Sequence, residues 1–111
     1  MRIKGNVISG KNKGEKIGFP TINLAIGEEY ASIMNPGVYA GKVFLGSQEK
    51  KAAIFIDSEK KILEAHILDF SGNLRGQNVE VELGVKLREV EKFNSDEELV
   101  EQIKSDIGRV T

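Results

Sequence analysis

Short apolar runs that alternate with polar residues recur along most of the chain. They are found in residues 2–9, Val38–Leu45, Ala52–Ile56, Ile62–Phe70 and Val79–Leu83. A period of two predicts half-buried strands, because successive side chains of a strand point to opposite faces. Pro20 lacks the N–H that a central strand needs, so it suits the start of a further strand. The pattern therefore predicts about six short strands.

The end of the chain changes to a helical period. Apolar residues recur at every fourth position, at Leu99, Ile103 and Ile107, with Val100 beside them. Ser95 and Glu98 form a capping box, and the acidic residues that follow Ser95 suit a helix N-terminus. We therefore predict a helix at residues 96–107 that stops at Gly108. Its apolar stripe is interpreted as core that packs against a sheet rather than as a partner-binding face.

Composition narrows the class of protein. The 111 residues suit one domain, 1–111, with no room for a second. Lys and Arg number 16 against 17 Asp and Glu, a balance that gives no electrostatic footprint for nucleic acid or for an anionic membrane. Absence of cysteine excludes disulfides and thiolate metal sites, and a single histidine excludes a His-rich zinc site. Without a signal-like or spanning apolar run, we expect a soluble cytoplasmic protein.

Many short strands with glycine-rich turns and one terminal helix predict a mainly β fold. Such a pattern is typical of a closed barrel or of a sandwich. Alternation alone does not choose between these two architectures.

The segment Gly18–Leu24 carries the most distinctive polar pair, in the order Gly-Phe-Pro-Thr-Ile-Asn-Leu. Thr21 and Asn23 are two residues apart, so their side chains point the same way in an extended segment. A hydroxyl and an amide carbonyl side by side are oxygen ligands that Mg²⁺ accepts beside phosphate oxygens. The same residues also suit an ordinary turn that opens a strand, and chemistry alone favours that simpler interpretation.

Residues 10–18 form a predicted loop with three glycines and three lysines. Such a loop lets the backbone approach a ligand closely and supplies cations, although a basic hairpin tip has the same composition. The loop does not match a phosphate-binding Walker A loop, because the spacing differs and no Ser or Thr follows the lysine.

Alternation within Ile62–Phe70 places Glu64 and His66 on one face and Leu63, Ala65 and Ile67 on the other. An unpaired buried carboxylate is expensive, so Glu64 indicates either a function or a half-exposed strand. We interpret His66 as a hydrogen-bonded structural histidine rather than as a base.

The Gly18–Leu24 motif resembles the signature of the riboflavin kinase family, whose members make FMN from riboflavin and ATP. Further matches follow in family order, at Pro36–Ala40, Glu64–Phe70, Leu87-Arg88 with Lys92-Phe93, and Leu99–Asp106. The resemblance covers nearly the whole chain. It implies a six-stranded antiparallel Greek-key barrel with one C-terminal helix at its open side.

The resemblance also implies the chemistry of particular residues. Glu64 would accept the proton of the ribityl terminal hydroxyl of riboflavin. Thr21 and Asn23 would hold Mg²⁺ and the terminal phosphates of ATP, while Arg88 and Phe93 would contact the flavin. The expected partners are riboflavin and ATP, with FMN as product, acting on a monomer that binds neither nucleic acid nor membrane.

The implied nucleotide contacts are Gly10, Lys16, Thr21, Ile67 and Asp69. Several features depart from the family pattern: the connection between Ile56 and Ile62 is shortened, Arg75 stands where the family usually has an aromatic residue, Val90 where it has a glutamate, and Glu15 where it often has an arginine. Many bacterial members also carry an FMN adenylyltransferase domain, for which this chain has no room. The alternative function is therefore a flavin- or nucleotide-binding module of the same fold without turnover.

Overall fold

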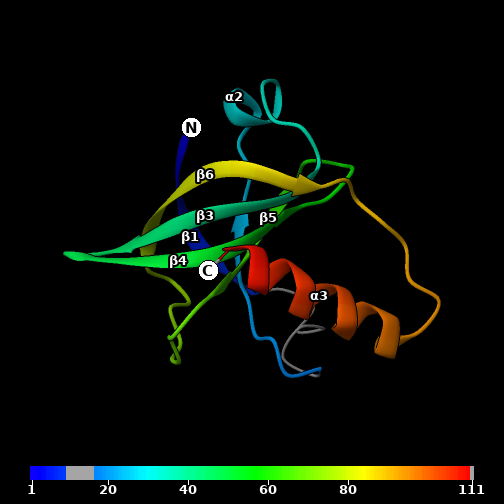
Figure 1. The fold of residues 1–111 in the computed structure, drawn as a ribbon. Helices are drawn as coiled ribbons and strands as arrows, with labels where there is room; N and C mark the ends of the chain where they lie inside the picture. Colours follow the sequence, from blue (N-terminus) through cyan, green and yellow to red (C-terminus); the bar gives the residue numbers. More distant parts are fainter. Residues whose placement is uncertain (10–16, 111) are drawn as a thin grey trace.

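A computed structural model describes residues 1–9 and 17–110 of the chain. Its six strands are β1 (Arg2–Ile8), β2 (Ile22–Ala25), β3 (Gly37–Leu45), β4 (Gln48–Ile56), β5 (Ile62–Ile67) and β6 (Asn78–Arg88). The strands close into a barrel in the order β1-β2-β5-β4-β3-β6 (Figure 1). Every neighbouring pair is antiparallel.

The connections between the strands make a Greek key. β3, β4 and β5 follow one another as adjacent strands, and β6 returns to lie beside β3. This spatial order, with the fourth strand beside the first, defines the motif. The predicted six-stranded antiparallel Greek-key barrel is therefore confirmed, and the open choice between barrel and sandwich is settled in favour of the barrel.

Apolar side chains from the inner face of the strands fill the barrel. The largest fully buried ones are Ile3, Leu24, Val43, Ile54, Ile56, Leu63 and Val81. In β5, Leu63, Ala65 and Ile67 are buried in this core, whereas Glu64 and His66 are half-buried on the outer face. The predicted alternation of β5 is therefore confirmed, and it turns Glu64 away from the packed interior.

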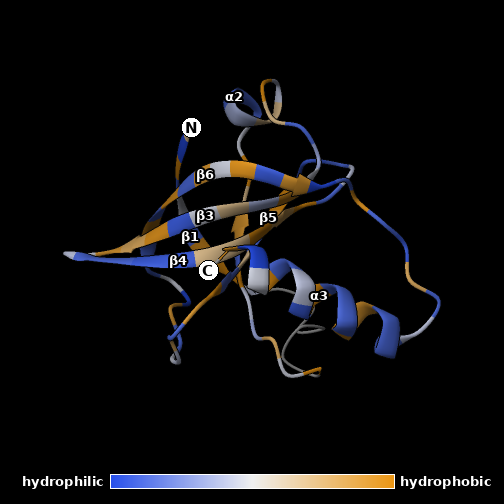
Figure 2. Ribbon diagram, viewed as in Figure 1, coloured by the Kyte–Doolittle hydropathy of each residue, from blue (hydrophilic) through white to orange (hydrophobic). Residues whose placement is uncertain are grey.

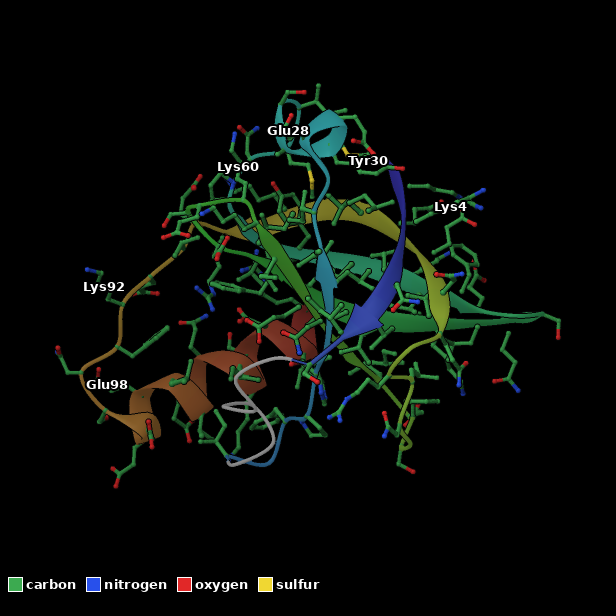
Figure 3. All side chains as sticks on the ribbon, turned by 180° about the vertical axis from the view of Figure 1, so that it is seen from behind. Lys4, Glu28, Tyr30, Lys60, Lys92 and Glu98 are labelled. Atoms are coloured by element: carbon green, nitrogen blue, oxygen red, sulfur yellow. The ribbon has the colours of Figure 1, made fainter. Side chains whose placement is uncertain are left out.

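A short helix at one end of the barrel was not predicted. α2 (Glu28–Ala31) lies in the polar stretch between β2 and β3, at the barrel end opposite α3 (Figure 1). Figure 3 labels Glu28 and Tyr30 on this helix. The Tyr30 side chain packs against the core, and Met34, just beyond the helix, is buried in it. A helix of four residues has too few apolar positions to show a period, which is why the sequence pattern did not predict it.

The C-terminal helix α3 (Asp96–Val110) lies against the outside of the barrel, where it contacts β3 and β4 (Figure 1). One of the two predicted capping-box bonds is confirmed: the Glu98 N–H donates to Ser95 Oγ at 3.2 Å. The Glu98 carboxylate accepts instead from the Asn94 N–H, at 3.1 Å, one residue before the N–H that a capping box uses. The predicted stop at Gly108 is wrong, because the helix continues to Val110.

The helix packs against the sheet as predicted, through contacts with β3 and β4, but its apolar stripe is not part of the barrel core, and that part of the interpretation was wrong. Leu99, Ile103 and Ile107 are half-buried, and none of them belongs to the buried cluster. Figure 2 shows that α3 is largely hydrophilic, whereas hydrophobic and hydrophilic residues alternate along the strands. The reason is the closed barrel, which fills its own interior and leaves α3 only its outer surface to cover.

Gly41 allows β3 and β6 to approach closely where their pairing is irregular. The register between these strands shifts on both sides of Tyr39. A Cβ atom at Gly41 would collide with the Glu82 carbonyl oxygen and with the Ile54 side chain. Because a backbone carbonyl in a ladder cannot move aside as a side chain can, this position requires glycine.

We expect Gly41→Ala to lower the free energy of unfolding by about 1–3 kcal/mol, the usual cost of overpacking. Gly108→Ala is the matched control, because an added Cβ in this exposed helical position meets no atom within 4 Å. Alanine there should raise stability by roughly 0.5–1 kcal/mol, since glycine is a poor helix residue. Urea unfolding of both variants measures the difference, and equal stability of the two would contradict the close approach.

Candidate functional site

The registers of five strands align one outward side chain from each strand into a row. Asn23 of β2 pairs with Glu64 of β5, which pairs with Phe55 of β4. Phe55 in turn pairs with Val38 of β3, and Val38 pairs with Arg88 of β6. Val38 is buried yet lies outside the barrel core. We call this line of five residues the outer row; it passes from polar groups through apolar ones to a cation.

A pocket of about 270 Å³ lies over the outer row, between the barrel and α3. Val38, Phe55 and Glu64 line it from the strands. The opposite side comes from α3 and from the connection between β6 and α3. Its lining residues are Glu91, Phe93, Leu99, Ile103 and Asp106, and Arg88 at the end of β6 also lines the pocket. Its lining is mostly apolar, with the carboxylate of Glu64 at one side. Such a pocket suits a flat aromatic ligand that ends in a polar group.

The structure brings Thr21, Asn23 and Glu64 together at the polar end of the outer row. Thr21 Oγ1 donates a hydrogen bond of 3.4 Å to Glu64 Oε1, and Asn23 lies opposite Glu64 in the β2–β5 ladder. Asn23 is only 7% exposed. A hydroxyl that donates to a carboxylate keeps its own lone pairs, which could bind a cation.

A second pocket of about 260 Å³ begins where the first one ends. Thr21 lines both pockets, and Asn23 lines the second, together with Asn73 and Arg75 from the loop before β6. Thr21 therefore stands between an apolar pocket and a more polar one, as a residue that meets the joined ends of two ligands would.

His66 holds the segment before β2 in place. Its Nδ1 lies 2.7 Å from the Pro20 carbonyl oxygen, and because a carbonyl can only accept, Nδ1 carries the proton. The Phe19 ring packs edge-on against the imidazole, with ring centroids 5.7 Å apart. This bond gives the Pro20 carbonyl a partner in the segment just before β2, which begins at Ile22. The predicted hydrogen bond of His66 is confirmed, while its side chain also lines the first pocket, so the interpretation as a structural residue rather than a base stays a prediction.

Other predicted nucleotide contacts are placed less directly. The Ile67 side chain is buried in the core and helps to line a pocket beside Thr21. Asp69 is exposed at a turn, with φ at 54°, and its carbonyl oxygen accepts a bond of 3.4 Å from Lys50. Gly10 and Lys16 lie outside the described residues. Ile67 and Asp69 stay predictions.

Arg88 and Phe93 meet at the other end of the outer row. The guanidinium carbon of Arg88 lies 5.7 Å from the centroid of the Phe93 ring. Arg88 also forms an ion pair with Asp106 of α3, with Nη2 and Oδ2 2.9 Å apart. The sequence pattern did not predict this ion pair. The sign that could have indicated it is the position of Asp106, an acidic residue on the same helical face as Leu99 and Ile103.

The candidate metal ligands at this site are the neutral hydroxyl and amide oxygens of Thr21 and Asn23, not a cluster of carboxylates. Among the described residues, no group of three or more His, Cys, Asp or Glu side chains could bind one. Thr21 and Asn23 fit Mg²⁺ because this ion commonly takes few protein ligands and completes its shell with water and substrate phosphates.

Comparison with known proteins identifies the family. The family model for riboflavin kinase matches residues 1–111. The bifunctional riboflavin kinase/FMN adenylyltransferase of Haemophilus influenzae is 39% identical over 96% of this chain and 36% of its own length. An RNA-binding riboflavin kinase of Bacillus subtilis is 33% identical over 97% of this chain and 49% of its own. The chain thus spans between about a third and a half of these two relatives.

Two solved structures share the fold. A crystal structure of a macrolide-efflux protein from Streptococcus pneumoniae superposes with a TM-score of 0.84 and 29% identity, over 96% of this chain and 37% of that one. Riboflavin kinase from Trypanosoma brucei superposes with a TM-score of 0.73 and 22% sequence identity, over 98% of this chain and 76% of that one. Among the described residues, none of the helices has the length and apolar character needed to cross a membrane. With the family model matched from end to end, the chain belongs to the riboflavin kinase family.

Proposed function

We propose that this chain transfers the γ-phosphoryl group of ATP to the ribityl terminal hydroxyl of riboflavin and so produces FMN. The observation that carries the proposal is the outer row, which sets the carboxylate of Glu64 between an apolar pocket and the polar pair Thr21 and Asn23. Phosphoryl transfer requires chiefly positioning and charge stabilisation. The outer row would supply the positioning, and Mg²⁺ held by Thr21 and Asn23 would supply the charge stabilisation.

At the flavin end, the ring system would lie on the apolar part of the outer row. Val38 and Phe55 would contact one face of the ring, and Phe93 with Leu99 and Ile103 would cover the other. Burial of a flat aromatic ring between apolar side chains is favourable, and the ring's polar edge could meet Arg88. The ribityl chain would then run toward Glu64.

At the phosphate end, Thr21 and Asn23 would hold Mg²⁺ together with the terminal phosphates. The ion, when bound, would neutralise the charge that develops on the transferred group. The chain's own residues would orient the phosphates from the second pocket, where Thr21 and Asn23 both contribute to the lining.

Glu64 would act as the general base. As the ribityl oxygen forms its bond to the γ-phosphorus and the bond from that phosphorus to ADP breaks, the hydroxyl proton passes to the Glu64 carboxylate. The hydrogen bond from Thr21 Oγ1 to Glu64 Oε1 would help to aim the carboxylate at the hydroxyl. A general base must first lie within hydrogen-bonding distance of the proton that it accepts, and only then does its basicity matter.

A second candidate, a binding module without turnover, is favoured by the short connection between β4 and β5. This connection is a tight turn in which the Lys60 N–H donates to the Asp57 carbonyl oxygen at 3.0 Å. Incubation with riboflavin and Mg-ATP separates the two functions. FMN and ADP released in equal amounts support the kinase, whereas bound flavin with no ADP supports the module.

We expect Glu64→Gln to lower kcat by about 10²- to 10⁴-fold, because glutamine keeps the size of the side chain but is a far weaker base. Affinity for riboflavin and thermal stability should stay close to those of the parent protein. Glu59→Gln is the matched control, since Glu59 is exposed in the β4–β5 connection and its ion-pair atoms lie 3.8 Å from Lys61. Turnover by Glu64→Gln at the parent rate would exclude Glu64 as the base.

We expect Asn23→Ala to lose the stabilisation that Mg-ATP gives the parent protein. A ligand that binds only the native state stabilises it by about 2.7 kcal/mol at a hundredfold excess over its dissociation constant. The stabilisation by riboflavin should persist, because the flavin would occupy the other end of the outer row. Melting curves with each ligand alone measure both effects. Asn78→Ala, at an exposed position of β6, is the control. A full Mg-ATP effect in Asn23→Ala would refute the metal assignment.

A further inference from the structure

An almost completely buried carboxylate joins the C-terminal helix to the barrel. Asp106 is the one buried residue that α3 contains, and its side chain is 4% exposed. Its partner Arg88, at the end of β6, is 15% exposed. Burial of a charge is expensive unless it is paired and hydrogen-bonded, so this pair must have good geometry to exist at all.

The hydrogen bonds of the pair leave the carboxylate saturated. Oδ1 of Asp106 accepts from Arg88 Nε at 3.0 Å and from Gln102 Nε2 at 3.1 Å, and Oδ2 accepts from Arg88 Nη2 at 2.9 Å. The remaining fork nitrogen, Nη1, donates to the Glu89 carbonyl oxygen at 3.1 Å. Asp106 also lines the pocket, but its carboxylate oxygens are engaged by Arg88 and Gln102, so it acts chiefly by holding these partners in place.

The same bonds fix the plane of the guanidinium group. A planar fork held at its edges by Asp106 and by the Glu89 carbonyl has little freedom to rotate, and its central carbon lies over the Phe93 ring, 5.7 Å from the ring centroid. A guanidinium cation within about 6 Å of the centre of an aromatic ring is attracted to it. Asp106 thus sets where Phe93, which lines the pocket, can lie.

The pair also sets the distance between the two sides of the pocket. Leu99 and Ile103 of α3 face Val38 and Phe55 across it, and these helix residues are only half-buried. The β6–α3 connection passes outside the barrel, with Lys92 on its outer side (Figure 3). The buried ion pair between Arg88 and Asp106 is a directional contact that holds this side of the pocket.

We propose that Asp106 is a positioning residue for flavin binding, which acts through Arg88 and Phe93 and sets the shape of the apolar pocket. This inference rests on the proposed function, and it concerns the flavin end alone. The nucleotide end, at Thr21 and Asn23, belongs to β2 and the segment before it, at the opposite end of the outer row from Arg88.

The first test is Asp106→Asn, which keeps the size of the side chain but turns an N–H donor toward the donors of Arg88. We expect the dissociation constant for riboflavin, measured by flavin fluorescence, to rise about tenfold, equivalent to about 1.4 kcal/mol, because Arg88 and Phe93 lose their fixed positions. The rise in melting temperature given by Mg-ATP should not change. The matched control is Glu101→Gln on the same helix, where Glu101 is exposed and 3.8 Å from Lys104; it should bind riboflavin like the parent protein.

The second test is the double variant Arg88→Met with Asp106→Leu. It is needed because Asp106→Asn alone leaves Arg88 buried without its partner, so that variant could bind riboflavin weakly only because it unfolds. Apolar residues of similar volume commonly replace a buried ion pair without loss of stability. We expect the double variant to melt near the parent temperature yet to keep the weakened riboflavin binding, because the oriented guanidinium is gone. Arg88→Lys, which retains the charge but not the fork, should also bind riboflavin more weakly.

Two results would overturn the inference: riboflavin binding by Asp106→Asn equal to that of the parent, or recovery of parent affinity by the double variant. The second result would mean that the pair merely attaches α3 to the barrel. Failure of the proposed function is recognised separately, because it appears in the parent protein itself as no riboflavin binding or no FMN formed.

Discussion

Closure of the barrel is the constraint on which the rest of the structure depends. Six antiparallel strands in one ring leave no free edge between them, and the ring is narrow enough for its own apolar side chains to fill it. Polar residues of the strands are therefore turned outward. A site built from Asn23, Glu64 and Arg88 must lie on the outer surface, and its second side must come from residues beyond the last strand.

The strand registers also fix the order of groups along the outer row. Neighbouring strands lie about 4.8 Å apart, so the four steps from Asn23 to Arg88 cover roughly 20 Å of curved sheet. That length suits a flat ring followed by a short chain and phosphates. A slip of one residue in β5 would turn Glu64 into the core and Leu63 outward, at the cost of a buried carboxylate. Packing of the interior thus keeps the exterior row in order.

Residue patterns predicted the parts of this structure that are set locally. Alternation identified the faces of β5, and the capping box identified the start of α3. The predicted helix end at Gly108 was wrong because a single glycine in an exposed helix costs only about 1 kcal/mol, which is too little to end the helix. The stripe that contains Leu99 was interpreted as core because an amphipathic period shows that one face of a helix is covered. It does not show whether the barrel core or a pocket lies against that face. Only the closed barrel reveals that a pocket lies beneath it.

Contacts between distant residues could not be predicted in the same way. Arg88 and Asp106 are 18 positions apart, and they meet only because α3 packs back across β3 and β4. A buried ion pair is weak evidence of stability, because desolvation of both charges offsets most of their attraction. What such a pair provides is orientation: an apolar contact would tolerate a sliding or rotated helix, whereas a saturated carboxylate opposite a planar fork accepts one arrangement. The helix that covers the pocket is largely polar and half-buried, so its position depends on direction more than on buried area.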